Sequence, residues 1–108
     1  MRDEIPPGTL YMLILKTLAR GGELHGYEIA NSIQQTSDEI LQVEEGSLYP
    51  ALQRMLLKGW VTAEWGVTAG NRRARYYRLT AMGRKQLQAE LAQFKRVNGA
   101  IQRVLQTT

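Results

Sequence analysis

The segment GNRRARYYRLT, residues 70–80, places four arginines and two tyrosines within eleven positions. Each guanidinium group presents a planar fork of N–H donors that fits the oxygens of a phosphate. Gly70-Asn71 is a turn signal, and Thr80 is a residue type that caps helices. The chemistry therefore predicts a phosphate-binding segment at a turn, anchored by its tyrosines and followed by a helix.

Charge is divided unequally between the two halves of the chain. Residues 1–53 hold three basic and eight acidic side chains, a net charge of −5, whereas residues 54–108 hold eleven and two, a net charge of +9. Such asymmetry favours a polyanionic partner, with nucleic acid the first candidate and an acidic membrane surface the second. A solvated basic face explains the charge equally well, so the residue pattern has to decide.

Length and composition limit the other classes of function. The 108 residues, 44% hydrophobic and 22% charged, fit one globular domain. There is no cysteine and only one histidine, and we find neither a paired nucleophile and base nor a phosphate-binding glycine loop. We therefore expect no enzyme, no metal and no cofactor. The longest apolar run is far shorter than the roughly 20 residues of a membrane span, which favours a cytoplasmic protein with no membrane partner.

Apolar periodicity predicts two helices before residue 36, at about residues 9–20 and 25–35. In the second, Ile29 and Ile33 lie one turn apart and face the core. The first is unusually rich in apolar residues, because Tyr11 and Leu15 widen its stripe beyond a single buried face. We expect this excess to contact a second subunit. The main stripe of this helix consists of Leu10, Leu13, Ile14 and Leu18.

A third helix is predicted within residues 43–60 and a hairpin after it. Strands at residues 60–65 and 73–79 flank a loop, and Tyr77 and Leu79 share the inward face of the second strand. Arg75 shares that face only near the tip, so Arg72, Arg73 and Arg75 gather at the outer end. The core side of the third helix consists of Leu48, Leu52, Met55 and Leu56.

Three helices followed by a basic hairpin form a winged helix-turn-helix, whose third helix lies in the major groove of DNA. The fold class is mainly α with one small β-hairpin. Residues 1–80 would form this DNA-binding unit, and residues 81–108 a long C-terminal dimerisation helix, within one compact domain overall.

The last helix is predicted from Thr80 to about Val104, with Gly83 and Gly99 as weak points. It is long enough to project beyond its own domain. A heptad spacing with one polar position favours a partner helix, although an amphipathic helix folded back on its own domain is the alternative. The seam consists of Leu87, Leu91, Phe94, Asn98, Ile101 and Leu105.

The strings LHGYEI, GSLYPALQRM, KGWVTAEWG and GNRRARYYRLTAMGR occur in this order over nearly the whole chain. Together they resemble the PadR family of bacterial transcriptional regulators, in the branch with a single C-terminal helix. The resemblance implies a homodimeric repressor that binds an inverted-repeat operator in double-stranded DNA. It also implies release by a small aromatic or drug-like effector, bound in an apolar pocket at the dimer centre where Phe94 could form an aromatic wall.

Candidate DNA contacts come from three parts of the chain. Ser47 and Gln53 are polar residues on the presumed reading helix and could contact base edges, although Ser47 could instead cap the helix. His25 would either touch phosphate or cap its helix. Tyr27 and Tyr49 would either donate hydroxyls to phosphate or pack in the core, and the family resemblance favours contact for Tyr49. The remaining candidates are Pro50, Arg54, Arg72, Arg73 and Arg75.

The two tryptophans, Trp60 and Trp65, are predicted to pack under the hairpin rather than to stack on bases. A second class of function is a winged-helix adaptor that binds proteins and no specific DNA. The arginine-rich tip favours DNA, since an adaptor has no need of it.

Overall fold

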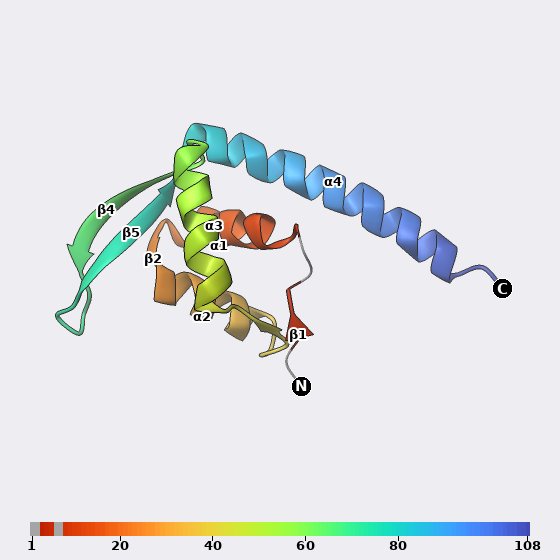
Figure 1. The fold of residues 1–108 in the computed structure, drawn as a ribbon. Coiled ribbons are helices and arrows are strands. Elements are labelled where there is room, and N and C mark those ends of the chain that lie inside the picture. Colours follow the sequence, from red (N-terminus) through yellow and green to blue (C-terminus); the bar gives the residue numbers. More distant parts are fainter. Residues whose placement is uncertain (1–2, 6–7) are drawn as a thin grey trace.

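A computed structural model describes residues 3–5 and 8–108, which form four helices and five strands (Figure 1). The helices are α1 (Leu10–Gly21), α2 (Gly26–Thr36), α3 (Glu45–Leu57) and α4 (Ala81–Leu105). The strands are β1 (Asp3–Glu4), β2 (Glu23–His25), β3 (Leu41–Gln42), β4 (Val61–Val67) and β5 (Arg73–Leu79). The mainly helical winged helix-turn-helix with a long last helix is confirmed.

The hairpin predicted from the sequence belongs to a larger sheet. Strand β5 lies in the middle, pairing antiparallel with β4 on one side and with β2 on the other. A second, parallel pair joins β1 to β3. Neither β2 nor the β1–β3 pair was predicted, because segments of two or three residues are too short to show a period of two.

The core lies between α1, α2, α3 and the base of the hairpin. The predicted Ile29, Ile33, Tyr77 and Leu79 are all buried there. On α3, three of the four predicted core residues are buried and Leu56 packs against them partly buried. In α1, Ile14 and Leu18 are buried, while Leu10 and Leu13 lie at the edge of the core.

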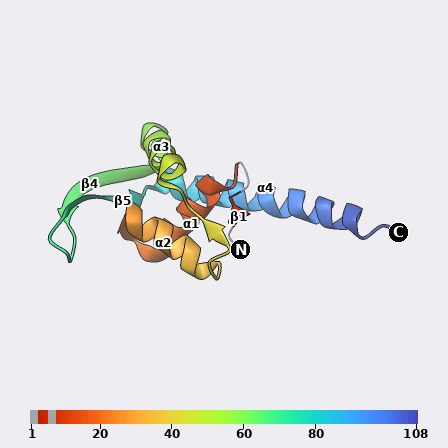
Figure 2. The same ribbon diagram turned by 60° about the horizontal axis from the view of Figure 1, so that its bottom comes forward.

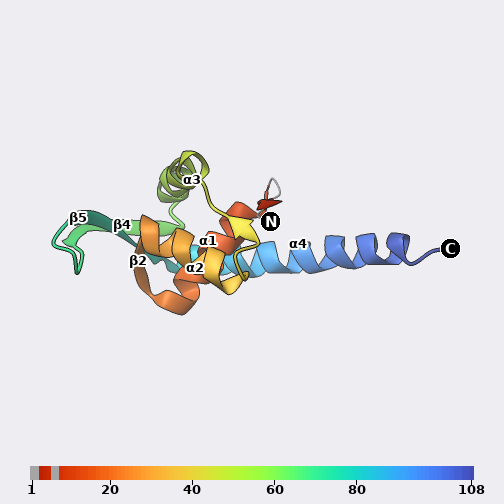
Figure 3. The same ribbon diagram turned by 90° about the horizontal axis from the view of Figure 1, so that it is seen from below.

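Helix α4 projects away from the rest of the molecule on the side opposite the hairpin tip, as all three views show (Figure 1, Figure 2, Figure 3). The radius of gyration is 15.2 Å, against ~13 Å for a compact chain of this length. None of the helices in the described part of the chain is long and apolar enough to cross a membrane. Because α4 projects beyond the rest of the molecule (Figure 1), the alternative of an amphipathic helix folded back on its own domain is wrong.

The first turn of α4 is fixed to the end of α3. Thr80 caps the helix by accepting a hydrogen bond from the backbone N–H of Gly83 at 3.0 Å, and its hydroxyl donates to the carbonyl of Gly59 at 2.7 Å. Gly83 is buried, and a Cβ there would overlap the carbonyl oxygen of Trp60 and lie 2.8 Å from Leu79 Cδ2. Gly83 was predicted as a weak point of the helix. Instead, its missing side chain allows the helix and the hairpin base to meet.

We expect Gly83→Ala to destabilise the protein by about 1–3 kcal/mol, because the added methyl group overpacks this junction. Gly99→Ala is the matched control on the same helix. Its Cβ would meet only the mobile end of Arg103 at 3.7 Å, so the control should be neutral or gain up to about 1 kcal/mol. Urea unfolding of both variants measures the difference, and equal stability of the two would refute the proposed junction.

Candidate nucleic-acid interface

A groove of about 880 Å³ lies between the start of α2, the outer side of α3 and the hairpin. We call it the interface groove, and we call β4, β5 and the loop between them the wing. Seven of the ten predicted DNA contacts line the groove, as do five further residues, and no carboxylate of the described chain does so. The seven are His25, Tyr27, Tyr49, Gln53, Arg72, Arg73 and Arg75.

One face of the wing passes from core to groove along its length. Successive cross-strand pairs on this face run from the wing base to its tip. The base is buried, whereas toward the tip Trp65 and Val67 are 62% and 61% exposed. Arg75 therefore follows Tyr77 on one face where the core ends, as predicted. The four pairs are Val61 with Leu79, Ala63 with Tyr77, Trp65 with Arg75, and Val67 with Arg73.

The two faces of the wing differ in charge balance. On the outer face Arg78 pairs with Glu23 at 2.8 Å. On the groove side, no ion pair of the described residues involves Arg72, Arg73 or Arg75. Their guanidinium charges are therefore available to an anion, whereas that of Arg78 is already partnered.

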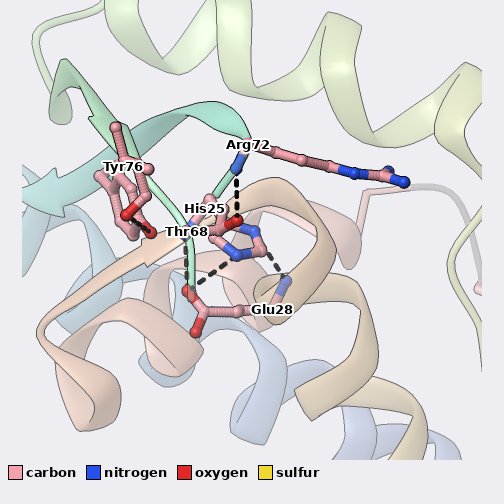
Figure 4. A network of polar contacts seen from close by, with 6 residues as sticks. His25, Glu28, Thr68, Arg72 and Tyr76 are labelled. Carbon is pink, nitrogen blue, oxygen red and sulfur yellow. Dashed lines mark hydrogen bonds and ion pairs between the residues drawn. The ribbon is translucent and has the colours of Figure 1, made fainter. Parts of the chain in front are cut away.

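The start of α2 is held by His25, the residue before its first turn. The backbone N–H of Glu28 donates to His25 Nδ1 at 3.4 Å, and the backbone N–H of His25 donates to Glu28 Oε1 at 3.1 Å (Figure 4). His25 thus caps the helix, as one of its two predicted roles required. Its ring also stacks on Tyr27 with centroids 6.4 Å apart and contacts Tyr76 edge-on. Because Tyr27 is 65% exposed, it lies on the groove wall and not in the core.

Tyr49 links α3 to the start of α2. A Cβ on Gly26 would lie 2.6 Å from the Tyr49 hydroxyl oxygen and 2.8 Å from a ring carbon, so only glycine lets the ring lie against this turn. Close by, burial raises the pKa of the Tyr77 hydroxyl above its ordinary value, although the charge of Arg75 acts in the opposite direction. Tyr49 and Tyr77 both line the interface groove beside the wing arginines.

The other three predicted contacts lie on a different side of α3. Ser47, Pro50 and Arg54 line a second groove of about 490 Å³ beside the N-terminal segment. The Nε–H of Arg54 donates to the Tyr11 hydroxyl, and its guanidinium lies 5.7 Å from the Tyr11 ring centroid. Arg54 is thus engaged within the subunit. Ser47 makes no capping bond for α3, whose cap is Glu44.

The two tryptophans have different surroundings. Trp60 is half-buried and meets the Tyr11 ring edge-on at 5.6 Å, with Lys58 above its face, so the prediction of packing is confirmed for it. For Trp65 that prediction is wrong, because the core ends at Tyr77 and the next position on this face is exposed. The sequence carried one signal for this, the arginine directly across the hairpin.

The predicted dimer contacts divide into internal and exposed residues. Leu15 is 0% exposed and Leu87 5% exposed within a single subunit, so their assignment to a partner is wrong. Tyr11 and Leu91 are partly buried against their own core. The other four, on the projecting part of α4, are exposed, together with Val97 and Val104, which the heptad spacing missed. These four are Phe94, Asn98, Ile101 and Leu105.

Comparison with known proteins gives concordant matches. A curated but uncharacterized protein of Lysinibacillus sphaericus is 30% identical over 87 residues, which is 81% of this chain and 79% of that protein. The structure of a transcriptional regulator from Clostridium thermocellum matches with a TM-score of 0.81 and 28% identity, over 89% of this chain and 92% of that one. Bacillus subtilis PadR in complex with operator DNA matches with a TM-score of 0.68 and 27% identity, over 80% of this chain and 48% of that one.

The sequence itself matches a family model, the Transcriptional regulator PadR-like family, over residues 14–89. That span runs from α1 through the wing into α4. The chain therefore belongs to the PadR-like family, whose members regulate transcription and are not enzymes.

Proposed function

We propose that this protein is a homodimeric transcriptional repressor that binds an inverted-repeat operator through α3 and the wing. The observation that carries the proposal is the interface groove, where three arginines of the wing converge with polar groups of α2 and α3 and no carboxylate of the described residues intervenes. Bacillus subtilis PadR, a structural relative, was solved with operator DNA. A cationic groove beside an exposed helix is the arrangement that places a reading helix in the major groove.

The proposed contacts fall into two kinds. Tyr49 and Gln53 are one turn apart on the exposed side of α3, facing the wing, so they would enter the major groove together. The wing arginines, with the helix start at His25, would bind the flanking phosphates. Ser47, Pro50 and Arg54 line a different groove of the protein, so they remain candidates only for contacts at the far edge of the DNA major groove.

Binding to a random-sequence duplex tests the proposal at its simplest. Fluorescence anisotropy should give an affinity that falls steeply between roughly 50 and 200 mM salt, because each phosphate contact releases counterions. An adaptor of the winged-helix type would show no such binding. Absence of salt-dependent binding would therefore overturn the proposal.

Gln53→Ala should lower affinity for the operator by about 1–3 kcal/mol at one base pair, if the amide makes a bidentate contact with an adenine. Gln53 is exposed and forms no side-chain hydrogen bond that the described structure records, so its removal should leave folding intact. Binding to operators changed at single positions measures the effect. Equal loss on every sequence would assign Gln53 to positioning and not to base recognition.

The homodimer is proposed from the exposed apolar face of α4. A projecting helix with an apolar stripe on an otherwise polar surface favours pairing with a second copy. Two-fold symmetry would then set two copies of α3 about one DNA turn apart, ~34 Å, which requires an inverted repeat.

Response to a planar aromatic effector is proposed from the α1–α4 side of the molecule. Phe94 and Val97 line a groove of about 420 Å³ there with Met12, and an aromatic wall suits a planar ligand. Phe94→Ala should weaken binding of such ligands by about ten-fold. Calorimetry on the dimeric variant checks this, and unchanged affinity would place the effector site elsewhere.

A further inference from the structure

Trp65 is a large aromatic residue on the exposed part of the wing. Its side chain is 62% exposed, which removes it from the core of the wing base. The pairing register puts Arg75 directly opposite it and Arg73 at the diagonal position on the same face. The Arg73 Cζ lies 4.7 Å from the Trp65 ring centroid and the Arg75 Cζ 5.8 Å from it. One ring is therefore in cation–π contact with two of the three groove arginines.

Both guanidinium groups contact the Trp65 ring, and neither is held by an opposite charge among the residues that the structure describes. No ion pair of the described residues involves either of them. The Nε of Arg75 is buried without a hydrogen-bond partner in the described part of the chain, so no acceptor there orients its guanidinium. Two like charges this close would otherwise separate into solvent, because arginine side chains have many rotamers.

The hairpin has a separate aromatic support on its other face. The Tyr76 ring lies against Gly66, where a Cβ would come within 2.9 Å of it, and the Tyr76 hydroxyl donates to the Val67 carbonyl at 3.5 Å. At the tip, the backbone N–H of Arg72 donates to the Thr68 hydroxyl at 3.2 Å, and the Arg72 side chain extends away from this turn (Figure 4). Trp65 is therefore not needed to close the wing.

We propose that Trp65 is a positioning residue for DNA binding, which holds Arg73 and Arg75 in place for two phosphates before DNA arrives. This inference rests on the proposed function. The ring orders both side chains in the free protein, so less conformational entropy is lost when they bind. Trp65 itself acts through the arginines and does not contact DNA.

The test compares two substitutions of Trp65 and one control variant by anisotropy on the same random duplex. Trp65→Leu keeps an apolar side chain in the strand but has no ring face, whereas Trp65→Phe keeps a ring. We expect Trp65→Leu to weaken binding roughly 5- to 50-fold, and Trp65→Phe to remain within about three-fold of the wild type. Val67→Ala, an equally exposed position on the same face, is the matched control and should change binding less than about two-fold. If Trp65→Leu binds the duplex as tightly as Trp65→Phe does, the proposal is overturned.

A double-mutant cycle separates positioning from direct contact. In a background of Arg73→Ala with Arg75→Ala, the loss caused by Trp65→Leu should shrink to less than about two-fold, because the groups that Trp65 positions are gone. An undiminished loss would mean that the ring contacts DNA itself, which overturns the inference. Wild-type binding is measured first: its absence would overturn the proposed function as well, whereas wild-type binding with an unaffected Trp65→Leu variant overturns this inference alone.

Discussion

Replacing Ile101 and Leu105 by glutamate is expected to convert the proposed dimer into a monomer that does not prefer an operator over random DNA. Both side chains are at least half exposed in a single subunit, so the change leaves the subunit core intact and places carboxylates where two apolar stripes would meet. Because one reading helix and one wing make too few contacts for selection, affinity for the operator should fall by at least ~100-fold, toward that for random DNA. Sedimentation measures the mass and competition binding measures the preference.

Ala92→Glu is the matched control for this seam experiment. Ala92 is exposed on the same helix, and helical geometry puts it about 140° around the axis from Leu87 and Leu105. The Ala92→Glu variant should stay dimeric and should still select the operator. A truncation before Leu87 would be a poorer test, because Leu87 belongs to the subunit core. A monomeric glutamate variant that still selects the operator would contradict the proposed role of the dimer.

Removal of Arg72 and Arg73 by alanine substitution is the second large effect that we expect. Both side chains are exposed at the tip of the wing and line the interface groove. Each lost phosphate contact should lower the slope of log affinity against log salt by roughly 0.9. Operator and random DNA should be weakened alike, since phosphate contacts carry no sequence information. Anisotropy titrations across the salt range give the slope.

Arg96→Ala with Arg103→Ala controls for net charge. This pair removes the same number of charges from the exposed surface of α4, on the side of the molecule away from the wing (Figure 1). Its salt slope should stay close to that of the wild type. If the wing pair behaves like this control, Arg72 and Arg73 are not phosphate ligands.

Periodic patterns in the sequence were enough to predict the helices, the wing and much of the groove. Ile29 and Ile33 keep helical spacing and Tyr77 and Leu79 keep strand alternation, and all four are buried where their period requires. The cluster of arginines between a turn signal and a helix cap located the wing tip. The periodicity of buried residues is a local property, so it survives without knowledge of the tertiary structure.

Features that depend on how the elements meet were not predictable in this way. Leu15 was assigned to a partner because α1 has more apolar surface than one face needs, yet α1 lies in the middle of the domain and is covered on several sides. The sequence marks Gly83 only as a weak point of the helix. The close approach to Trp60 that requires a glycine there joins residues of different elements, so no local pattern reveals it. The sequence predicts that Trp65 packs under the hairpin, because its exposure depends on where the hydrophobic core ends beneath the wing, which no local pattern shows.

Selection of genomic DNA fragments by the purified protein tests the central claim most directly, that a symmetric dimer reads DNA with two copies of α3 and the wing. Recovered fragments are sequenced and compared with the input. We predict enrichment of a shared inverted repeat whose half-site centres lie about one helical turn apart, ~34 Å, or a multiple of it. Enrichment of sequences without two-fold symmetry, or no enrichment above input, would contradict the account.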